Sequence, residues 1–145
     1  MNPPKLTKAF RDKKWKEAIE LLNDIVRIKL APSPIHGIGV FALRDLKKGD
    51  KLYADVIPNA FDLPLRKFKK LRPEIREQIL NHWPNIVNGA HFLYPVTKMT
   101  AFMNHGEANY DINTDEVLKP IKCGEEVLVD YKKFANSEKI FKWLK

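Results

Sequence analysis

The first part of the chain carries apolar residues at helical spacing. From Lys5 to about Asp24 there is no glycine or proline, and residues with high helix propensity dominate. Basic residues separate the apolar positions, which are Phe10, Trp15, Ala18, Ile19 and Leu22. This pattern predicts one amphipathic helix that packs its apolar stripe on the rest of the domain, as an N-terminal extension over residues 1–24.

From residue 25 onward the hydrophobic period shortens to two. Val26, Ile28 and Leu30 alternate with basic residues, which is typical of a half-buried strand. Further apolar runs are separated by Gly and Pro turns, at residues 35–42, 51–57, 91–94, 101–103, 117–118 and 126–129. Many short strands between turns predict a mostly β domain over residues 25–133, with helical additions.

A helical insert is expected over residues 60–90, where the strand pattern is interrupted. Asp62 precedes Leu-Pro and is expected to cap one short helix, and Pro73 suits the first turn of a second. Much of the basic charge lies here, on Arg66, Lys67, Lys69, Lys70, Arg72 and Arg76. Ser137 is expected to begin a last short helix, within a C-terminal tail over residues 134–145.

The formal net charge of +8 is unevenly distributed along the chain. The segment from Thr100 to Tyr131 holds two lysines and seven acidic residues, a net charge of −5, so the remaining residues carry +13. Two interpretations stay open. Either the charges are solvated faces without a specific partner, or the acidic segment receives a cationic substrate while the basic remainder meets nucleic acid or another acidic partner.

The cysteine and histidine content argues against a disulfide framework or a metal site. Cys123 is the single cysteine, and the histidines at positions 36, 82, 91 and 105 offer no close ligand pair. No apolar run reaches membrane-spanning length, and the N-terminus lacks the apolar stretch of a secretory signal. These features predict a metal-free intracellular domain, cytoplasmic or, in a eukaryotic or viral source, nuclear.

Three segments carry residues suited to chemistry, although each alone has an ordinary structural explanation. The Gly-Ile-Gly of residues 37–39 lets a ligand approach the backbone, or simply eases a bend in a strand. The Asn-His pair at residues 104–105 offers several directed hydrogen bonds, or satisfies a turn. The run Gly-Glu-Glu-Val-Leu-Val-Asp-Tyr at residues 124–131 is a turn and a strand that end in a tyrosine.

Taken in this order, the three segments resemble the SET domain. The family pattern has G-x-G early, N-H late and G-E-E-x-x-x-D-Y shortly afterwards, and all three match this chain. The resemblance spans roughly residues 25–133. It implies a β-clip-like fold of small, mostly antiparallel sheets with a knot-like crossing near the C-terminus, and a variable helical insert.

The resemblance also implies a function, the S-adenosylmethionine-dependent transfer of methyl groups to lysine side chains of a protein. It implies that backbone meets the methionine part of the cofactor at Gly37, Ile38 and Gly39. The residues implied to hold the adenosine end are Asn104 and His105. Tyr131 is implied to lie at the transferring methyl, as the catalytic residue of a protein-lysine N-methyltransferase.

A lysine substrate would need a channel that favours its neutral amine. Desolvation lowers the pKa of a lysine from its ordinary value of about 10.4, and aromatic faces stabilise nearby cations. Four aromatic residues are candidates for lining the channel, with core packing as the alternative for each: Tyr94, Phe134, Phe141 and Trp143. The acidic segment favours a lysine in a basic context, as in a histone-like protein.

The sequence departs from the family pattern at several positions. Gly106 stands where serine is usual, and Ala101 stands where many members have arginine. Ala108 replaces a usual proline, and Asn109 arrives one residue early. These changes leave open a first alternative, a SET-like binding module that has lost catalysis. The charge of +13 outside the acidic segment leaves open a second alternative, a basic nucleic-acid-binding domain. The second can also coexist with the enzyme.

Overall fold

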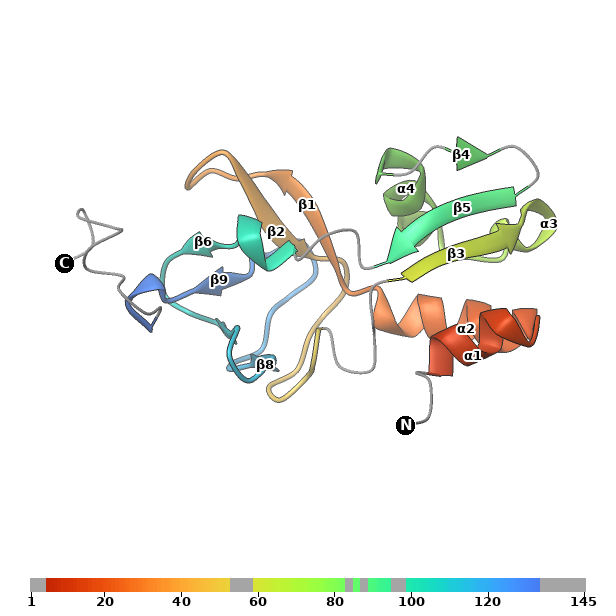
Figure 1. Cartoon of the computed structure of the whole chain (residues 1–145). Helices are drawn as coiled ribbons and strands as arrows, with labels where there is room; N and C mark the ends of the chain where they lie inside the picture. Colours follow the sequence, from red (N-terminus) through yellow and green to blue (C-terminus); the bar gives the residue numbers. More distant parts are fainter. Residues whose placement is uncertain (1–4, 53–58, 83–84, 87–88, 95–98, 134–145) are drawn as a thin grey trace. The chain divides into compact units, whose positions relative to one another are not determined.

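A computed structural model of the chain describes residues 5–52, 59–82, 85–86, 89–94 and 99–133. The chain forms two compact units (Figure 1). The first comprises Met1–Arg27 and Leu52–Lys98, and the second comprises Ile28–Lys51 and Met99–Lys145. Each unit has its own buried apolar residues and is described by itself.

The first unit begins with two helices, α1 (Lys5–Arg11) and α2 (Trp15–Ile25), where the sequence predicts one. Lys13 adopts a left-handed backbone, with φ of 54°, directly after α1. The N–H of Lys14 donates to the carbonyl oxygen of Ala9 at 2.9 Å, as in a Schellman motif, and satisfies the end of α1. The prediction of a single continuous helix is therefore wrong, because the chain ends α1 with a lysine in the conformation that glycine usually takes.

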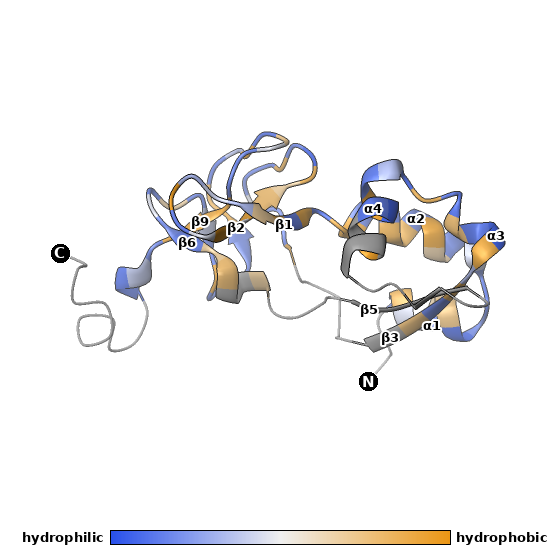
Figure 2. Cartoon of the chain, turned by 90° about the horizontal axis from the view of Figure 1, so that it is seen from above, coloured by the Kyte–Doolittle hydropathy of each residue, from blue (hydrophilic) through white to orange (hydrophobic). Residues whose placement is uncertain are grey.

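The first unit also contains a three-stranded antiparallel sheet, in the order β3 (Asn59–Pro64), β5 (Gly89–Tyr94) and β4 (Asn85–Ile86). Phe61 of β3 is buried, and its ring centroid lies 4.7 Å from that of Phe10 in α1. Figure 2 shows α2 with both apolar and polar residues, as in an amphipathic helix. The helical pair and the sheet therefore share one core.

Two helices lie between β3 and β4 in the sequence, α3 (Leu65–Phe68) and α4 (Pro73–His82). Pro73 is the first residue of α4, as predicted, and the side chain of Ile75 in the same helix is buried. The predicted cap at Asp62 is wrong, because strand β3 continues through this residue to Pro64. Pro64 is the N-cap residue of α3, and the helix has no side-chain capping hydrogen bond.

The described part of the second unit contains three two-stranded sheets. An antiparallel hairpin is formed by β1 (Ile28–Pro32) and β2 (Ile38–Ala42). A parallel pair joins β6 (Asn104–His105) to β9 (Leu128–Val129), and an antiparallel pair joins β7 (Tyr110–Asp111) to β8 (Glu116–Val117). The core side chains include Val40, Leu46, Met103, Tyr110, Ile121 and Val127.

The described part of the second unit also contains two 3₁₀ helices, η1 (Met99–Phe102) and η2 (Tyr131–Lys133). The strand predicted at residues 101–103 is wrong, because most of this run lies in η1. Within this run Met103 is buried, whereas Phe102 is 40% exposed, so the apolar pattern predicts neither strand pairing nor uniform burial here. The predicted tail at 134–145 and most of the predicted strand at 51–57 lie outside the described residues.

Within the described ranges, no helix has both the length and the apolar character needed to cross a membrane.

Candidate functional site

The Gly-Ile-Gly segment lies where the β1–β2 hairpin turns back. The backbone N–H of Ser33 donates to the carbonyl oxygen of Gly37 at 2.8 Å, and Gly37 has φ of 47°. A Cβ placed on Gly37 would meet nothing within 4 Å, so a ligand can approach its backbone. A Cβ on Gly39 would collide with the carboxylate of Glu126, so glycine is needed there for a different reason.

The Glu126 carboxylate fills the space beside Gly39. The hydroxyl of Ser33 donates to it, with Oγ 2.7 and 3.0 Å from the two carboxylate oxygens. The amide Nδ2 of Asn104 donates to Oε2 at 2.9 Å. Glu126 is also the backbone bridge partner of Phe41. One carboxylate thus joins the hairpin, β6 and the segment before β9.

Asn104 connects the Asn-His pair to the G-x-G turn. Its side chain is buried, with 6% of its surface exposed. Besides Glu126, its Nδ2 lies within hydrogen-bonding distance of the carbonyl oxygens of His36, at 3.1 Å, and Ile38, at 3.4 Å. Because these carbonyls flank Gly37, Asn104 fixes the shape of the turn.

His105 and Tyr131 come together through the parallel pairing of β6 and β9. His105 lies opposite Val129, and its Nδ1 accepts the backbone N–H of Tyr131 at 3.0 Å. A ring nitrogen that accepts a hydrogen bond carries no proton, so the neutral imidazole holds its proton on Nε2. The ring centroids of His105 and Tyr131 lie 5.3 Å apart. His105 therefore positions the start of η2.

The Tyr131 hydroxyl is anchored to the residue before the Asn-His pair. It donates to the carbonyl oxygen of Met103 at 2.6 Å. Burial raises the pKa of this hydroxyl above its ordinary value, so it is protonated at neutral pH. A phenol oxygen that donates one hydrogen bond keeps its capacity to accept another.

Sequence reasoning missed three residues that hold this site, Ser33, Glu126 and Asn109. Asn109 is buried, its Oδ1 accepts the N–H of Leu128 at 2.8 Å, and its Nδ2 donates to the carbonyl oxygen of Glu126 at 2.9 Å. One amide thus pairs with two backbone groups of the segment that leads into β9. The sequence carries two signals for them: Asn109 follows shortly after the Asn-His pair, and Glu126 is the second Glu of the Gly-Glu-Glu motif, but neither is assigned a role by the resemblance.

Gly106, which departs from the family pattern, lies against the side chain of Leu128. A Cβ at this position would lie 2.9 Å from Cδ1 of Leu128. The backbone N–H of Gly106 still donates to the carbonyl oxygen of Val129, at 3.2 Å. The altered segment therefore continues the pairing of β6 with β9.

A sequence model of the SET domain matches residues 37–132, from the G-x-G turn through Tyr131. This range is well over half of the chain. The chain belongs to the SET-domain family. SET domains form a family of protein-lysine methyltransferases that typically bind S-adenosylmethionine. No curated protein matches the chain significantly.

Several solved structures are similar to this SET domain. A Plasmodium falciparum protein described as a candidate histone methyltransferase is 18% identical, over 74% of this chain and 95% of its own, with a TM-score of 0.37. Two structures of the Chaetomium thermophilum Polycomb Repressive Complex 2, one a humanized mutant, are 16% identical over 98% and 95% of this chain, with TM-scores of 0.43. This chain covers only 21% and 19% of those chains. The family assignment rests on the match over residues 37–132.

The SET-domain motif residues gather in one unit, whereas the side chains of the proposed channel residues lie outside the described part of the chain. The six predicted cofactor and catalytic residues all lie in the second unit, and hydrogen bonds connect their three segments. Tyr94 belongs to β5 of the first unit, and its side chain is outside the description. Phe134, Phe141 and Trp143 fall outside the described residues, so their roles stay predictions.

Several residues of the acidic segment are engaged locally. Glu107 pairs with Lys119 at 3.0 Å, and Glu116 pairs with Lys51 at 3.3 Å. The hydroxyl of Tyr110 donates to Asp115 at 2.7 Å. Lys119 is already counted in the net charge of −5, so only Lys51, which lies outside the segment, offsets a further negative charge.

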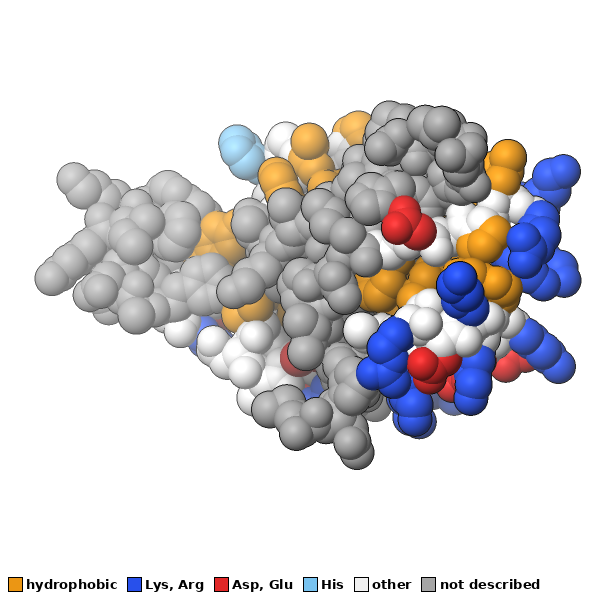
Figure 3. Space-filling view, turned by 45° about the vertical axis from the view of Figure 1, so that its right-hand side comes forward, with side chains coloured by type: hydrophobic (Ala, Val, Ile, Leu, Met, Phe, Trp, Pro, Cys, Tyr) orange, Lys and Arg blue, Asp and Glu red, His pale blue; other side chains and the backbone are white. Residues whose placement is uncertain are grey.

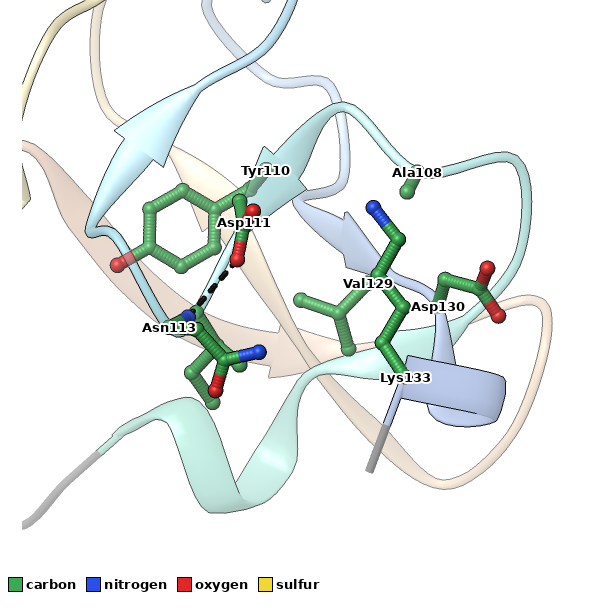
Figure 4. Close-up of a pocket in the computed structure, with 8 residues that line it drawn as sticks. Ala108, Tyr110, Asp111, Asn113, Val129, Asp130 and Lys133 are labelled. Atoms are coloured by element: carbon green, nitrogen blue, oxygen red, sulfur yellow. Dashed lines mark hydrogen bonds between the residues drawn. The ribbon is translucent and has the colours of Figure 1, made fainter. Parts of the chain in front are cut away.

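A shallow polar pocket beside η2 carries two of the remaining carboxylates (Figure 4). Its lining consists of Ala108, Tyr110, Asp111, Ile112, Asn113, Val129, Asp130 and Lys133. Asp111 accepts the backbone N–H of Asn113 at 2.9 Å, and Asp130 accepts that of Lys132 at 3.0 Å. These bonds orient both side chains without neutralising them. Across the described residues, no group of three or more His, Cys, Asp or Glu could hold a metal ion.

Proposed function

We propose that this SET domain is a protein-lysine N-methyltransferase that uses S-adenosylmethionine. The proposal rests on one observation, that hydrogen bonds connect the three motif segments. Asn104 binds the turn that contains Gly37, and His105 accepts the backbone N–H of Tyr131. The residues that the family chemistry requires are therefore held together by one another.

The G-x-G turn suits a cofactor that is held by backbone groups. Gly37 offers an open backbone, and Ile38 is 51% exposed beside it. In the proposal, Gly37, Ile38 and Gly39 meet the methionine part, and Asn104 and His105 hold the adenosine end. The bound cofactor would supply a methyl group activated by a sulfonium.

Tyr131 acts in the proposal as the catalytic residue at the transferring methyl. Its hydroxyl is anchored 2.6 Å from the Met103 carbonyl oxygen, which fixes where its remaining lone pairs point. Because burial raises the pKa of this hydroxyl, Tyr131 stays neutral and does not take the proton of the incoming lysine. Its role is to align the amine and the methyl group.

The proposed substrate is a lysine in a basic protein context, for example a histone-like protein. Asp111 and Asp130 give the pocket beside η2 a negative charge that Lys133 only partly offsets. The channel for the lysine is proposed to involve Tyr94, Phe134, Phe141 and Trp143. Replacing Asp111 with Asn should weaken the binding of a basic peptide more than the binding of a neutral one.

The proposal extends to the organisation of the chain. It comprises an N-terminal extension over residues 1–24, the SET domain over residues 25–133 and a tail at 134–145. The insert at 60–90, predicted as helical, contains the strands β3 and β4 as well as the helices α3 and α4. The knot-like crossing near the C-terminus is supported by the parallel pairing of β6 with β9. An intracellular location is proposed from the single exposed cysteine, which suits a reducing compartment.

A second contact is favoured by a basic cluster in the first unit, which consists of Arg66, Lys67, Lys69, Lys70, Arg72 and Arg76. Glu74 is the one acidic residue within residues 66–76, and it pairs with Arg72 at 3.4 Å. Lys70 lowers the pKa of the Lys67 ammonium, as expected where like charges crowd. Figure 3 shows Lys and Arg side chains gathered over the helices of this unit. We propose that the cluster contacts nucleic acid.

The cluster is tested with a labelled DNA duplex of about 20 base pairs, long enough to span several phosphate contacts. Replacing Lys67, Lys69 and Lys70 with Gln should weaken binding and reduce its salt dependence, whereas replacing Lys47 and Lys48 should not. Equal effects of the two sets would reject the cluster as the site. Equally tight binding to polyglutamate would assign it to acidic proteins instead.

The methyltransferase proposal is tested by transfer of radiolabelled methyl groups to a lysine-containing basic peptide. Wild-type protein should label the peptide, and Tyr131→Phe should lose most of the activity while still binding cofactor. Cofactor binding without transfer to any basic peptide would favour the alternative of a SET-like binding module. Equal activity of Tyr131→Phe would reject the assigned role of Tyr131.

A further inference from the structure

The Glu126 carboxylate lies in an unusual place for a charge that forms no ion pair with any of the described residues. It lies against Gly39, where a Cβ would come within 2.9 Å of its Cδ. The absence of a side chain on Gly39 thus brings a carboxylate directly to the G-x-G backbone. The side chain is half-buried, so solvent screens its charge less than at the surface.

The described donors to this carboxylate are neutral. They are the hydroxyl of Ser33 and the amide of Asn104. By contrast, the exposed Glu107 and Glu116 each have a lysine partner. These neutral donors add no positive charge beside the carboxylate of Glu126.

A ligand held by the G-x-G backbone would lie in the field of this charge. S-adenosylmethionine carries a positive sulfonium, and S-adenosylhomocysteine has a neutral sulfur in its place and lacks the methyl group. We propose that Glu126 is a specificity-determining residue that favours the cationic cofactor over its neutral product. The inference rests on the proposed function, because it requires the cofactor to occupy the G-x-G turn.

This attraction would end with the reaction itself. Methyl transfer from sulfur to a neutral lysine amine breaks the sulfur–carbon bond and forms a nitrogen–carbon bond. The bonding pair stays on sulfur, and the positive charge passes to the methylated amine. The proton that the lysine lost beforehand goes to water. Glu126 would therefore hold the reactant more strongly than the product and so aid product release.

The test compares dissociation constants of the two ligands, measured by calorimetry, in the wild type and in Glu126→Gln. Glutamine keeps the shape and can still accept from Asn104, but it removes the charge. We expect the affinity for S-adenosylmethionine to fall by about tenfold relative to that for S-adenosylhomocysteine, since a partly buried unit charge contributes on that order. Equal weakening of both ligands would overturn the inference.

Two matched variants separate charge from structure. Ser33→Ala removes a hydrogen-bond donor to the carboxylate but keeps the negative charge. The affinities for both ligands should therefore fall by the same factor. Glu125→Gln removes a neighbouring exposed charge that accepts the Lys122 N–H in a turn, and it should leave the ratio unchanged. A shift of the ratio in either variant as large as that in Glu126→Gln would count against Glu126.

A further pair keeps the inference testable if Glu126→Gln does not fold. Ile38 is exposed, so Ile38→Lys places a cation at the same turn with little risk to the core. It should lower the preference for S-adenosylmethionine relative to the uncharged control Ile38→Gln, and an unchanged ratio would show that charge at this turn does not discriminate the ligands. Failure of the wild type to bind either ligand would instead reject the proposed function.

Discussion

Replacing Gly39 with alanine tests whether the carboxylate of Glu126 and the G-x-G turn pack as one unit. The new Cβ would lie 2.9 Å from Cδ of Glu126 and 3.0 Å from Cβ of Ser33, and closer still to Oε2. Contacts this short force the carboxylate or the hairpin to move. A displaced carboxylate would weaken its hydrogen bonds from Ser33 and Asn104.

The loss of stability follows from these two effects. Overpacking a filled site costs about 1–3 kcal/mol, and a hydrogen bond to a charged group contributes about 1.5–3 kcal/mol. We expect Gly39→Ala to lower the free energy of unfolding by about 2–4 kcal/mol, because the two effects partly replace each other. For a domain of this size, that corresponds to a fall in Tm of about 5–15 °C.

Urea denaturation followed by circular dichroism measures this loss, and Gly37→Ala is the matched control. A Cβ on Gly37 meets no neighbour, so the cost there is only that of a left-handed backbone, about 1–2 kcal/mol. In the double variant Gly39→Ala/Glu126→Ala, the new methyl group gains the space of the carboxylate. The combined loss should therefore be smaller than the sum of the single losses by about 1 kcal/mol or more.

Two results would refute this reasoning. The first is a Gly39→Ala protein within about 0.5 kcal/mol of the wild type, the range of an ordinary surface substitution. The second is strict additivity in the double variant, which would mean that Glu126 does not occupy the space beside Gly39.

Three further predictions follow from the described contacts. Asn109→Ala should lower the free energy of unfolding by about 2–3 kcal/mol in urea, because it leaves backbone groups of Leu128 and Glu126 without their partner. Gly106→Ser should cost less than about 1 kcal/mol by the same assay, since it meets only the flexible end of Leu128. Tyr131 should ionise above the ordinary tyrosine value, because burial raises its pKa. The stability that this neutral hydroxyl contributes is present below about pH 10 and is lost as pH rises through the raised pKa. Absorbance titration of the wild type and of Tyr131→Phe would follow the ionisation of this residue.

The motif residues could be predicted from the sequence because their spacing is specific. The turn at residues 37–39, the pair at 104–105 and Tyr131 were identified by resemblance, and the structure brings their segments together. Pro73 also marked the start of α4, since proline at the first helical turn loses no hydrogen bond.

The residues that hold the site together could not be predicted, because their roles depend on contacts distant in sequence. Glu126 and Ser33 are far apart along the chain, and neither residue type is unusual in a turn or strand. The break between α1 and α2 escaped detection for a related reason. Lys13 adopts a left-handed backbone there, although lysine carries no propensity signal for such a turn.

The central claim is that the G-x-G turn, the Asn-His pair and Tyr131 form a cofactor site for methyl transfer. Calorimetric titration with S-adenosylmethionine tests it most directly, because it needs no knowledge of the substrate. The account predicts saturable one-to-one binding by the wild type and a large loss of affinity in Asn104→Ala. Absence of binding by folded wild-type protein would contradict it.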